Sequence, residues 1–447
     1  MKKIVIIGAG PTGLGAAHRL KELGHKNFLV YEKNSYPGGL CASFKDKQGF
    51  TWDLGGHVIF SHYKYFDKFL THALGNNYLK HKRRAWIRTM DRWIPYPFQN
   101  NLRYLPKEII TECLDSLRQV RLKKKKSNNF KEWVFDNMGK SIAKYFMLPY
   151  NFKVWAHPIH MLSSDWINER VSPVKLKDAV ELLASEADET DWGPNATFKF
   201  PLFGGTNTIF KKTVSSLNSH IHFNSELIGV DAGSKKILLS GNRKESYDIL
   251  INTSPLDKFI KLIKGSGKDL SSAGLNLKHN GVYIVGIGFN KPCPSNKCWM
   301  YFPDKNSPFF RVTYFSNYSP NNVPDSKKHF SLLCESAYSK YKKEEKAKIV
   351  EKTIQGLVKS GLIKKSDRKF IISKFLFDID CAYPIPTLKR NEALREIQTE
   401  LEKMDMYSRG RFGAWKYEIG NTDHSMMQGK EIVDRLLRKG KEKVWSL

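Results

Sequence analysis

The chain of 447 residues is 41% hydrophobic and 13% aromatic, which excludes a disordered protein and favours two or three folded domains. Lysine and arginine number 74 against 44 aspartate and glutamate residues, a net charge of +30 that would attract anionic partners. No helix-turn-helix, zinc-finger or RNA-recognition pattern accompanies this charge, and we interpret the densest basic run, RLKKKKSNNFK at 121–131, as a solvated loop rather than a nucleic acid site.

The cysteines and the apolar segments indicate in which cellular compartment the protein is expected. Six cysteines lie scattered without CxxC pairs in a chain too long to depend on disulfides, so reduced thiols and a cytoplasmic location are expected. The first residues, MKKIVIIGAGPTGLGAA, mimic a secretory signal, but Gly8, Gly10 and Pro11 interrupt the apolar run. No stretch approaches the roughly 20 apolar residues of a membrane span, so no membrane insertion is expected.

The N-terminal segment has the strand–turn–helix–strand order of a Rossmann-like unit. A buried strand at 3–7 is followed by GAGPTG, a helix over 14–24 and a second strand at 28–32. This order favours an α/β fold in which a ligand lies against the first turn.

The turn itself matches the GxGxxG pattern of dinucleotide-binding proteins. Gly8 permits the tight turn, Gly10 lets a pyrophosphate contact the backbone, and Gly13 lets the helix approach the strand. The helix N-terminus would face the phosphates, and Glu32 ends the second strand where it can accept hydrogen bonds from a ribose.

A second glycine pair distinguishes between FAD and NAD. In EKNSYPGGL, Gly38 and Gly39 come soon after Glu32, a continuation typical of FAD-binding chains. No second GxGxxG unit follows, so a separate NAD(P) domain is not expected and a reductant would have to share the flavin cleft.

The segment GGHVIFSHYKYFD at 55–67 places a histidine after two glycines and then four aromatic rings. Taken alone, this pattern fits a turn followed by an ordinary amphipathic helix as well as it fits a ligand-binding loop.

The rest of the chain alternates between two patterns. Residues 100–190 have helical periods, whereas short aromatic and β-branched runs from about 280 predict an antiparallel sheet. After 387 the chain returns to helix, and its last helix is expected to begin near 421–423. The predicted fold is therefore α/β with three parts: a discontinuous FAD-binding Rossmann-like domain at 1–78, 197–255 and 386–447, a helical substrate domain at 99–196, and an antiparallel sheet domain at 79–98 and 256–385.

Several long blocks resemble one enzyme family. They are GGHVIFSHYKYFD, WIPYPFQNN, LPYNFKVWA, WINERV, WGPNATF, CWMYFP, FRVTYFSNYSP, YPIPTL and RGRFGAWKYEIGNTDHS. In order and approximate spacing, from about residue 3 to 438, they resemble UDP-galactopyranose mutases, particularly the eukaryotic-type branch.

The resemblance implies a flavin enzyme without net redox chemistry. Reduced FAD would attack the anomeric carbon of UDP-galactopyranose through N5, UDP would leave and later return, and the sugar would reclose as a furanose for cell-surface glycan synthesis. NADPH is the expected external reductant. No paired carboxylates, Ser/His/Asp set or metal ligands stand out in the sequence, and this chemistry needs none.

The resemblance also implies roles for individual residues, with His57, Arg170 and Arg311 central to catalysis. The flavin would contact a loop and a helix start made of Gly55, Gly56, His57, Arg411, Gly420, Asn421 and Thr422. The diphosphate would be held by Arg170, Arg311, Tyr301, Tyr383 and Tyr417. The uridine and sugar would be held by Phe60, Arg83, Tyr96, Gln99, Asn151, Trp155, Asn195 and Trp299.

The sequence departs from the family in places and leaves alternatives open. Ala85 stands where the family has serine, and GGLCAS is unusual after the glycine pair. The chain stops soon after IVDRLLRKGKEKVWSL, without the longer extension of eukaryotic-type members, so monomer and homodimer both stay open. UDP-N-acetylgalactosamine and UDP-arabinose are alternative substrates. An amine oxidase or desaturase-like oxidoreductase and a non-catalytic nucleotide-sugar or nucleic acid binder are the alternative functions.

Overall fold

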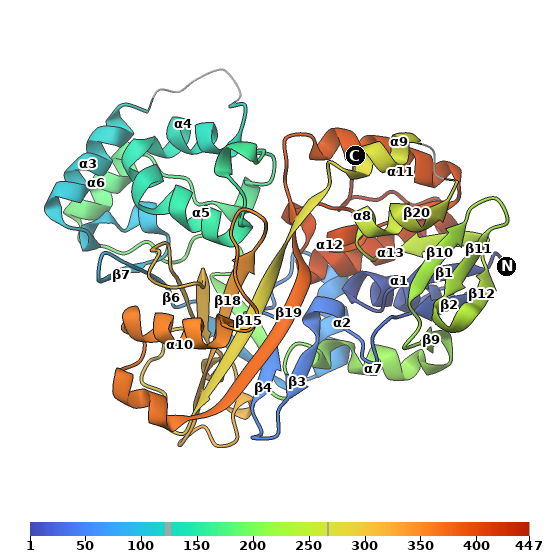
Figure 1. Ribbon diagram of the computed structural model, residues 1–447, viewed down its shortest axis with the longest axis horizontal. Coiled ribbons are helices and arrows are strands. Elements are labelled where there is room, and N and C mark those ends of the chain that lie inside the picture. Colours follow the sequence, from blue (N-terminus) through green and yellow to red (C-terminus); the bar gives the residue numbers. More distant parts are fainter. Residues whose placement is uncertain (121–126, 266–267, 447) are drawn as a thin grey trace.

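The computed structural model describes residues 1–120, 127–265 and 268–446. A five-stranded parallel sheet lies on one side of the molecule, a long seven-stranded sheet crosses its middle, and a group of helices lies on the other side (Figure 1). The basic run predicted to be a solvated loop lies, over 121–126, outside the described residues. Among the described residues, no helix combines the length and apolar character needed to cross a membrane.

The parallel sheet begins with the apolar run IVII, which forms a strand because its β-branched side chains are buried on both faces. Its strands, in spatial order, are β20 (Met406–Ser408), β13 (Ile249–Asn252), β1 (Ile4–Ile7), β2 (Phe28–Tyr31) and β9 (Ile221–His222), and all neighbours are parallel. This is the arrangement that the GxGxxG turn predicts.

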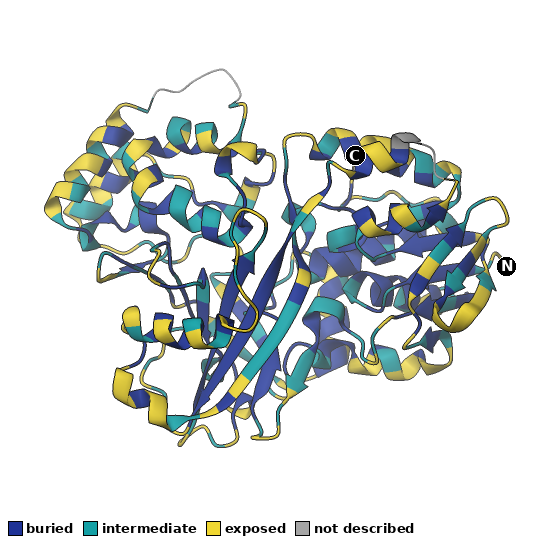
Figure 2. Ribbon diagram, viewed as in Figure 1, coloured by how far each residue is buried: buried dark blue, intermediate teal, exposed yellow. Residues whose placement is uncertain are grey.

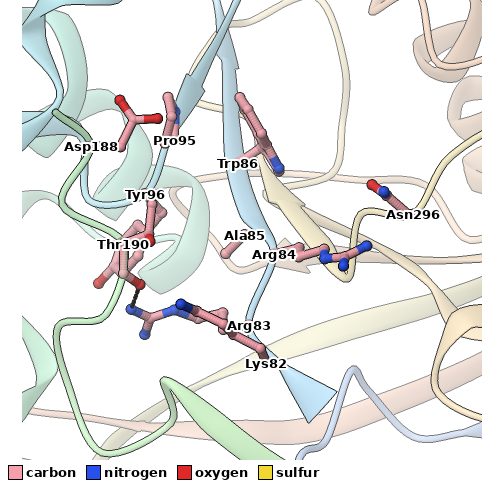
Figure 3. A pocket seen from close by; sticks show the side chains of 10 residues that line it. All are labelled: Lys82, Arg83, Arg84, Ala85, Trp86, Pro95, Tyr96, Asp188, Thr190 and Asn296. Carbon is pink, nitrogen blue, oxygen red and sulfur yellow. Dashed lines mark hydrogen bonds between the residues drawn. The ribbon is translucent and has the colours of Figure 1, made fainter. Parts of the chain in front are cut away.

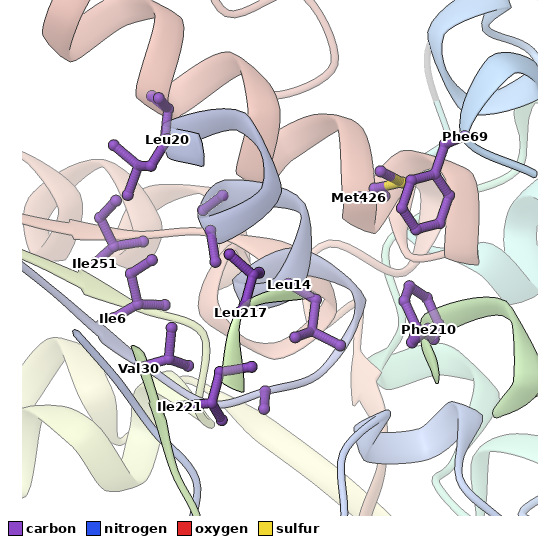
Figure 4. Close-up of a cluster of buried hydrophobic side chains, with 14 of the residues drawn as sticks. Ile6, Leu14, Leu20, Val30, Phe69, Phe210, Leu217, Ile221, Ile251 and Met426 are labelled. Atoms are coloured by element: carbon purple, nitrogen blue, oxygen red, sulfur yellow. The ribbon is translucent and has the colours of Figure 1, made fainter. Parts of the chain in front are cut away.

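Helices cover both faces of this sheet. On one face are α1 (Pro11–Glu22), α2 (Lys64–Leu74), α7 (Thr208–Ser216) and α13 (Thr422–Arg438), and their apolar side chains form the cluster in Figure 4. On the other face are α8 (Leu256–Phe259), α9 (Lys268–Gly274), α11 (Arg390–Lys403) and the small sheet of β12 (Arg243–Ser246), β11 (Lys236–Leu239), β10 (Leu227–Asp231) and β14 (Ile263–Lys264). Helix α1 begins three residues earlier than predicted, because proline is well suited to a first helical position.

The central sheet has the order β19 (Ile371–Ile385), β15 (Lys278–Phe289), β18 (Phe330–Tyr338), β17 (Arg311–Tyr314), β16 (Trp299–Tyr301), β6 (Ala85–Thr89) and β7 (Arg92–Pro95). The predicted antiparallel pairing is confirmed for every pair of neighbours except β16 and β6, which pair in parallel. Buried residues run along β15 and β18 inside the sheet, whereas the edge strand β19 is partly exposed, and α10 (Ile349–Lys359) packs on one face (Figure 2). Two antiparallel pairs complete the strands. One joins β3 (Ser43–Lys45) to β4 (Thr51–Asp53), and the other joins β5 (Tyr78–Lys82) to the distant β8 (Thr197–Pro201).

The helical part consists of α3 (Lys107–Arg118), α4 (Phe130–Ile142), α5 (Leu148–Trp155) and α6 (Leu176–Ala184) around its own apolar core. The side chain of Asn129 caps α4 by accepting from the backbone N–H of Glu132, as asparagine commonly does at this position. Short α12 (Gly410–Gly413) lies in the approach to α13.

The division into three parts stays our proposal, with one adjustment. The side chains of Leu256, Phe259, Ile263 and Leu277 pack in the core that contains Val5 of the parallel sheet. The segment 256–277 is therefore best grouped with the FAD-binding part rather than with the central sheet.

Candidate active site

The two glycine-rich turns lie against each other at the carboxyl end of β1. The Gly38 N–H donates to the carbonyl of Ala9 at 2.8 Å, and a Cβ on Gly10 would lie 3.8 Å from the Cα of Gly39. A Cβ on Gly13 would overlap the carbonyl oxygen of Gly8, so only glycine lets α1 approach the turn this closely. Bare backbone and the start of α1 thus form a cradle that suits a pyrophosphate.

The buried carboxylate of Glu32 is fixed at the end of β2. It accepts from the N–H of Ala9 at 2.8 Å and from the backbone and side chain of Asn34 at 2.9 and 2.8 Å. A carboxylate has about four acceptor positions, so one stays open to a ribose hydroxyl.

The loop of Gly55, Gly56 and His57 is anchored to the central sheet. The Gly56 N–H donates to Glu335 Oε1 at 3.1 Å, and a Cβ on Gly56 would lie 2.5 Å from Thr313 Oγ1. Gly55 has a φ of 133°, which strongly favours glycine. This part of the segment is a closely packed loop, and the helix α2 begins only at Lys64.

His57 is neutral at physiological pH. Burial, with the nearby Arg311 and Arg411 guanidinium groups, lowers the pKa of His57 to about 4, although Glu335 acts in the opposite direction. Its buried Nδ1 has no hydrogen-bond partner among the described residues. The ring can therefore offer one donor and one acceptor, and it is a poor proton reservoir at pH 7.

Arg311 lies on β17, directly opposite Glu335 on β18. Its Nε and terminal nitrogen donate to the two carboxylate oxygens at 2.6 and 2.7 Å, a bidentate pair. Burial would lower the pKa of Arg311, but Glu335 and the neighbouring tyrosines raise it well above its ordinary value. The guanidinium is thus permanently charged and held rigidly, with its positive charge compensated.

Arg170 and Arg411 both lie close to the ring of Tyr417. Their guanidinium carbons are 5.1 and 5.5 Å from its ring centre, and Arg411 also lies 4.9 Å from the ring centre of Tyr383. Arg170 donates to Asn421 Oδ1 and to the carbonyl of Glu418, both at 2.8 Å. Arg411 donates to the carbonyls of Ala382 and Gly420, and burial lowers its pKa.

Two of the predicted residues, Arg83 and Tyr96, line a pocket of about 350 Å³ beside β6 (Figure 3). Arg83 lies 5.3 Å from the ring centre of Tyr96 and donates to Asn195 Oδ1 at 2.6 Å and to the carbonyl of Thr190 at 2.7 Å. Tyr96 packs 5.1 Å from the ring of Tyr301, whose hydroxyl accepts from Trp299 at 2.7 Å.

Three cationic side chains have only neutral partners. Among the described residues, Arg83, Arg170 and Arg411 form no ion pair with a carboxylate. Arg83 is 4% exposed, so its charge is held away from water at a cost that a bound anion would offset.

The remaining predicted residues have more local partners. Trp155 packs 4.9 Å from the ring of Tyr417 and Phe60 packs 5.5 Å from the ring of His62. The buried amide of Gln99 donates to the carbonyl of Ser172 at 2.7 Å, and that of Asn151 donates to the carbonyl of Met147, just before α5, at 2.8 Å. The Gln99 oxygen has no partner among the described residues, which leaves it available as an acceptor.

The last helix begins where the sequence predicts. Asn421 precedes α13, the Thr422 hydroxyl lies 3.5 Å from Cys41 Sγ beside the second glycine turn, and Gly420 accepts from Arg411. The first amides of α13 therefore face the region between the glycine turns and Arg411, where the helix dipole would stabilise negative charge.

Sequence reasoning missed two residues of the site. Glu335 gave a weak signal as the one acid in the apolar run HFSLLCES, but its position opposite Arg311 depends on strand register. Tyr150, in the block LPYNFK, packs 5.2 Å from Tyr301 and could not be distinguished from a core tyrosine.

Comparisons with known proteins agree with this geometry. The family model for an NAD(P)-binding Rossmann-like domain matches residues 6–73. A crystal structure of a reduced UDP-galactopyranose mutase is 44% identical, with a TM-score of 0.96 over 99% of this chain and 95% of that one.

Other relatives share less. A 4,4'-diapophytoene desaturase of Staphylococcus aureus is 43% identical over 76 residues, which are 17% of this chain and 14% of the desaturase. A putative protoporphyrinogen oxidase from Exiguobacterium covers 97% of this chain and 98% of its own at 15% identity and a TM-score of 0.75, a likeness of fold alone.

Proposed function

The chain belongs to the UDP-galactopyranose mutase family, and from this premise we propose that it interconverts UDP-galactopyranose and UDP-galactofuranose with no net redox change. The observation that carries the proposal is the set of guanidinium groups around the tyrosines. Arg170 and Arg411 both lie close to the ring of Tyr417 and have no carboxylate partner among the described residues, and Arg311 lies within electrostatic reach of Tyr383. Such a set suits a diphosphate that leaves as an anion and must be retained.

The residues fit FAD as the cofactor. The paired glycine turns form the cradle for a pyrophosphate, and the buried Nδ1 of His57 without a partner marks a polar atom that a ligand could satisfy. When bound and reduced, the flavin supplies a nucleophilic nitrogen for the anomeric carbon. The chain's own groups would hold it: Glu32 at the ribose, the α13 amides and Arg411 at the negatively charged edge, and Gly55, Gly56 and His57 at the ring.

The protein's other residues would bind and orient the substrate. Arg170, Arg311, Tyr301, Tyr383 and Tyr417 would hold the diphosphate, and Tyr96 would stack on the uracil with the Gln99 oxygen as acceptor. Arg83, Asn195, Trp299, Trp155, Asn151 and Phe60 would line the nucleoside and sugar positions. Because His57 is neutral, its proposed role is a hydrogen bond near the flavin rather than proton transfer.

The proposal also covers the branch of the family, the sugar, the reductant, the cellular location and the oligomeric state. We favour the eukaryotic-type branch because of the sequence blocks that carry the resemblance, and UDP-galactose over UDP-N-acetylgalactosamine and UDP-arabinose. NADPH is our proposed reductant, in the same cleft as the substrate. The six free thiols support a cytoplasmic location, and both a monomer and a homodimer are consistent with the proposal. An amine oxidase or desaturase would favour an apolar tunnel or aromatic cage over a buried set of arginines.

The test is conversion by the purified yellow protein. The holoenzyme is reduced anaerobically with dithionite or NADPH, and the conversion of UDP-galactofuranose to UDP-galactopyranose is followed by chromatography. Conversion that requires the reduced flavin is expected. A protein that contains flavin and binds UDP but converts neither sugar would point to one of the other two UDP-sugars.

A further inference from the structure

His62 lies outside the predicted site but contacts both sides of it. The ring bridges two carboxylates from distant parts of the chain: Nδ1 lies 2.7 Å from Asp423 Oδ2, and Nε2 lies 3.2 Å from Glu169 Oε2. Asp423 is in the first turn of α13, while Glu169 is next to Arg170 in a short 3₁₀ turn, Asn168–Arg170. The backbone N–H of His62 also donates to Asp423 Oδ2 at 3.1 Å.

The bridge requires a proton. Ionised carboxylates only accept hydrogen bonds, so both ring nitrogens can donate at once only when His62 is an imidazolium. Burial would lower the pKa of His62, but the hydrogen bond and charge of Asp423, with Glu169, raise it above its ordinary value. Other charged or titratable groups also lie beside the cluster. They are His424 on α13, Arg170 on the turn, and Tyr63, whose ring packs against both His62 and His424 and which interacts with Asp423, Glu169 and Glu431.

The turn that carries Arg170 needs support from outside. Asn168 has a φ of 26°, in the region that non-glycine residues rarely adopt. Two hydrogen bonds join this turn to the segment just before α13, and the Arg170 guanidinium donates both of them, to Asn421 Oδ1 and to the Glu418 carbonyl. A diphosphate bound to Arg170 would compete for these donors. In the part of the chain that the structure describes, the contact between Glu169 and His62 is a hydrogen bond from this turn that does not involve the guanidinium.

We propose that His62, as an imidazolium, is a positioning residue that holds the Arg170 turn against α13 while the guanidinium engages the substrate diphosphate. This inference rests on the proposed function, because it needs Arg170 to bind the diphosphate. It adds a charge-dependent contact between the helical part of the chain and the parallel-sheet part.

A metal ion is a less suitable occupant of the same cluster. His62, Asp423 and His424 place ligand atoms within 4.8 Å of one another. However, Asp423 Oδ2 already accepts two hydrogen bonds from His62, and the positive end of α13 and the Arg170 charge oppose a further cation. We therefore assign the cluster to a proton.

The experiment compares His62→Gln with His62→Arg. Gln keeps a donor without charge, whereas Arg can donate to both carboxylates and stays charged at every accessible pH. Affinity for UDP-galactose, whose diphosphate diester does not titrate in this range, is measured by calorimetry on the oxidised holoenzyme between pH 6 and 9. The wild-type affinity should fall as pH rises through the raised pKa of His62. His62→Gln should bind about tenfold more weakly at pH 6 with little pH dependence, and His62→Arg should bind tightly across the range.

Further variants separate positioning from general damage. Glu169→Gln should weaken binding like His62→Gln, while His160→Gln, an exposed histidine of the helical part, should change nothing. In turnover assays the effect should appear in KM more than in kcat. Equal affinity and equal pH dependence in wild type and His62→Gln would overturn the inference, and so would an affinity lost on treatment with a chelator and regained with Zn²⁺. If the wild type does not bind UDP-galactose at all, the proposed function fails instead.

Discussion

Arg311 and Arg170 are both assigned to the diphosphate, yet the structure supports them in different ways. Arg311 comes from a strand inside the seven-stranded sheet and forms a bidentate pair with the buried carboxylate of Glu335. Arg170 comes from a 3₁₀ turn and donates to neutral oxygens of Asn421 and Glu418. Arg311 is therefore held rigidly, and its charge is balanced by Glu335. Arg170 is held by hydrogen bonds that a ligand could replace, and no carboxylate among the described residues balances its charge.

The difference suggests that the two arginines have different roles in binding the diphosphate. A fixed guanidinium on a sheet can define where the diphosphate lies, because its rotamer is set by the pair with Glu335. A guanidinium on a turn can exchange neutral partners for the anion with little loss, and the net positive charge beside Tyr417 comes from it and from Arg411.

Arg311→Ala should have the largest effect. It removes a diphosphate contact and leaves Glu335 buried without its partner, so a negative charge would face the substrate. We expect kcat/KM to fall by roughly 10³-fold, equivalent to about 4 kcal/mol. Stability should fall by about 3–5 kcal/mol in a urea unfolding titration of the holoenzyme.

The double variant Arg311→Met with Glu335→Leu separates the two losses. Replacing both charges with apolar side chains should recover most of the stability but none of the activity. Recovery of activity in the double variant would show that the single variant failed through the stranded carboxylate rather than through the lost diphosphate contact.

Arg170→Ala should cost less. The Asn421 amide and the Glu418 carbonyl are neutral, so the free energy of unfolding should change by only about 1 kcal/mol. Loss of charge-assisted hydrogen bonds to the diphosphate should lower kcat/KM by about 10–100-fold. Arg118→Ala, an exposed arginine of the same helical part, is the control. A stability loss as large as that of Arg311→Ala would mean that the turn is as rigidly built as the strand.

The fold could be predicted from the sequence wherever the signal is local. Gly8, Gly10 and Gly13 between apolar strand and helix specify the parallel sheet, and the start of α13 at Thr422 follows from the sequence YEIGNTD. The parallel pairing of β16 with β6 was missed, because it joins strands more than 200 residues apart and nothing local encodes it.

The same distinction between local signals and long-range contacts applies to the candidate site. Residues in the sequence blocks that resemble the family, such as Arg170 and Tyr417, lie close together in the structure. The guanidinium carbon of Arg170 is 5.1 Å from the ring centre of Tyr417. Glu335 and the bridge from His62 to Glu169 could not be found, because each depends on contacts between segments distant in sequence. Resemblance therefore locates the groups that touch the ligand more readily than the groups that position them.

Glu335→Gln sharpens the comparison by making the sheet arginine resemble the turn arginine. The amide has nearly the same shape but no charge, so Arg311 would be left uncompensated beside the diphosphate site. We expect the UDP dissociation constant to fall by roughly 3–10-fold, since one competing anion is gone, while stability falls. Calorimetry and unfolding titrations measure both quantities, and Glu345→Gln on the surface is the control. Weaker UDP binding would mean that Glu335 acts mainly by orienting Arg311.

The smallest effect to look for is a difference between two histidines five residues apart. His57 lies on the sheet side, where burial and the Arg311 and Arg411 charges lower its pKa to about 4; His62 lies on the turn side, where Asp423 and Glu169 raise its pKa. In proton NMR titrations of the oxidised holoenzyme, the His62 resonance should shift above its ordinary pKa, whereas that of His57 should stay constant from pH 8 to about 5. His57→Gln and His62→Gln assign the two signals. A His57 signal that titrates near pH 6.5 would show that water reaches the loop of Gly55, Gly56 and His57. The neutral state of His57 depends on burial, so this result would contradict the contrast between a buried site beside Arg311 and a more exposed site beside Arg170.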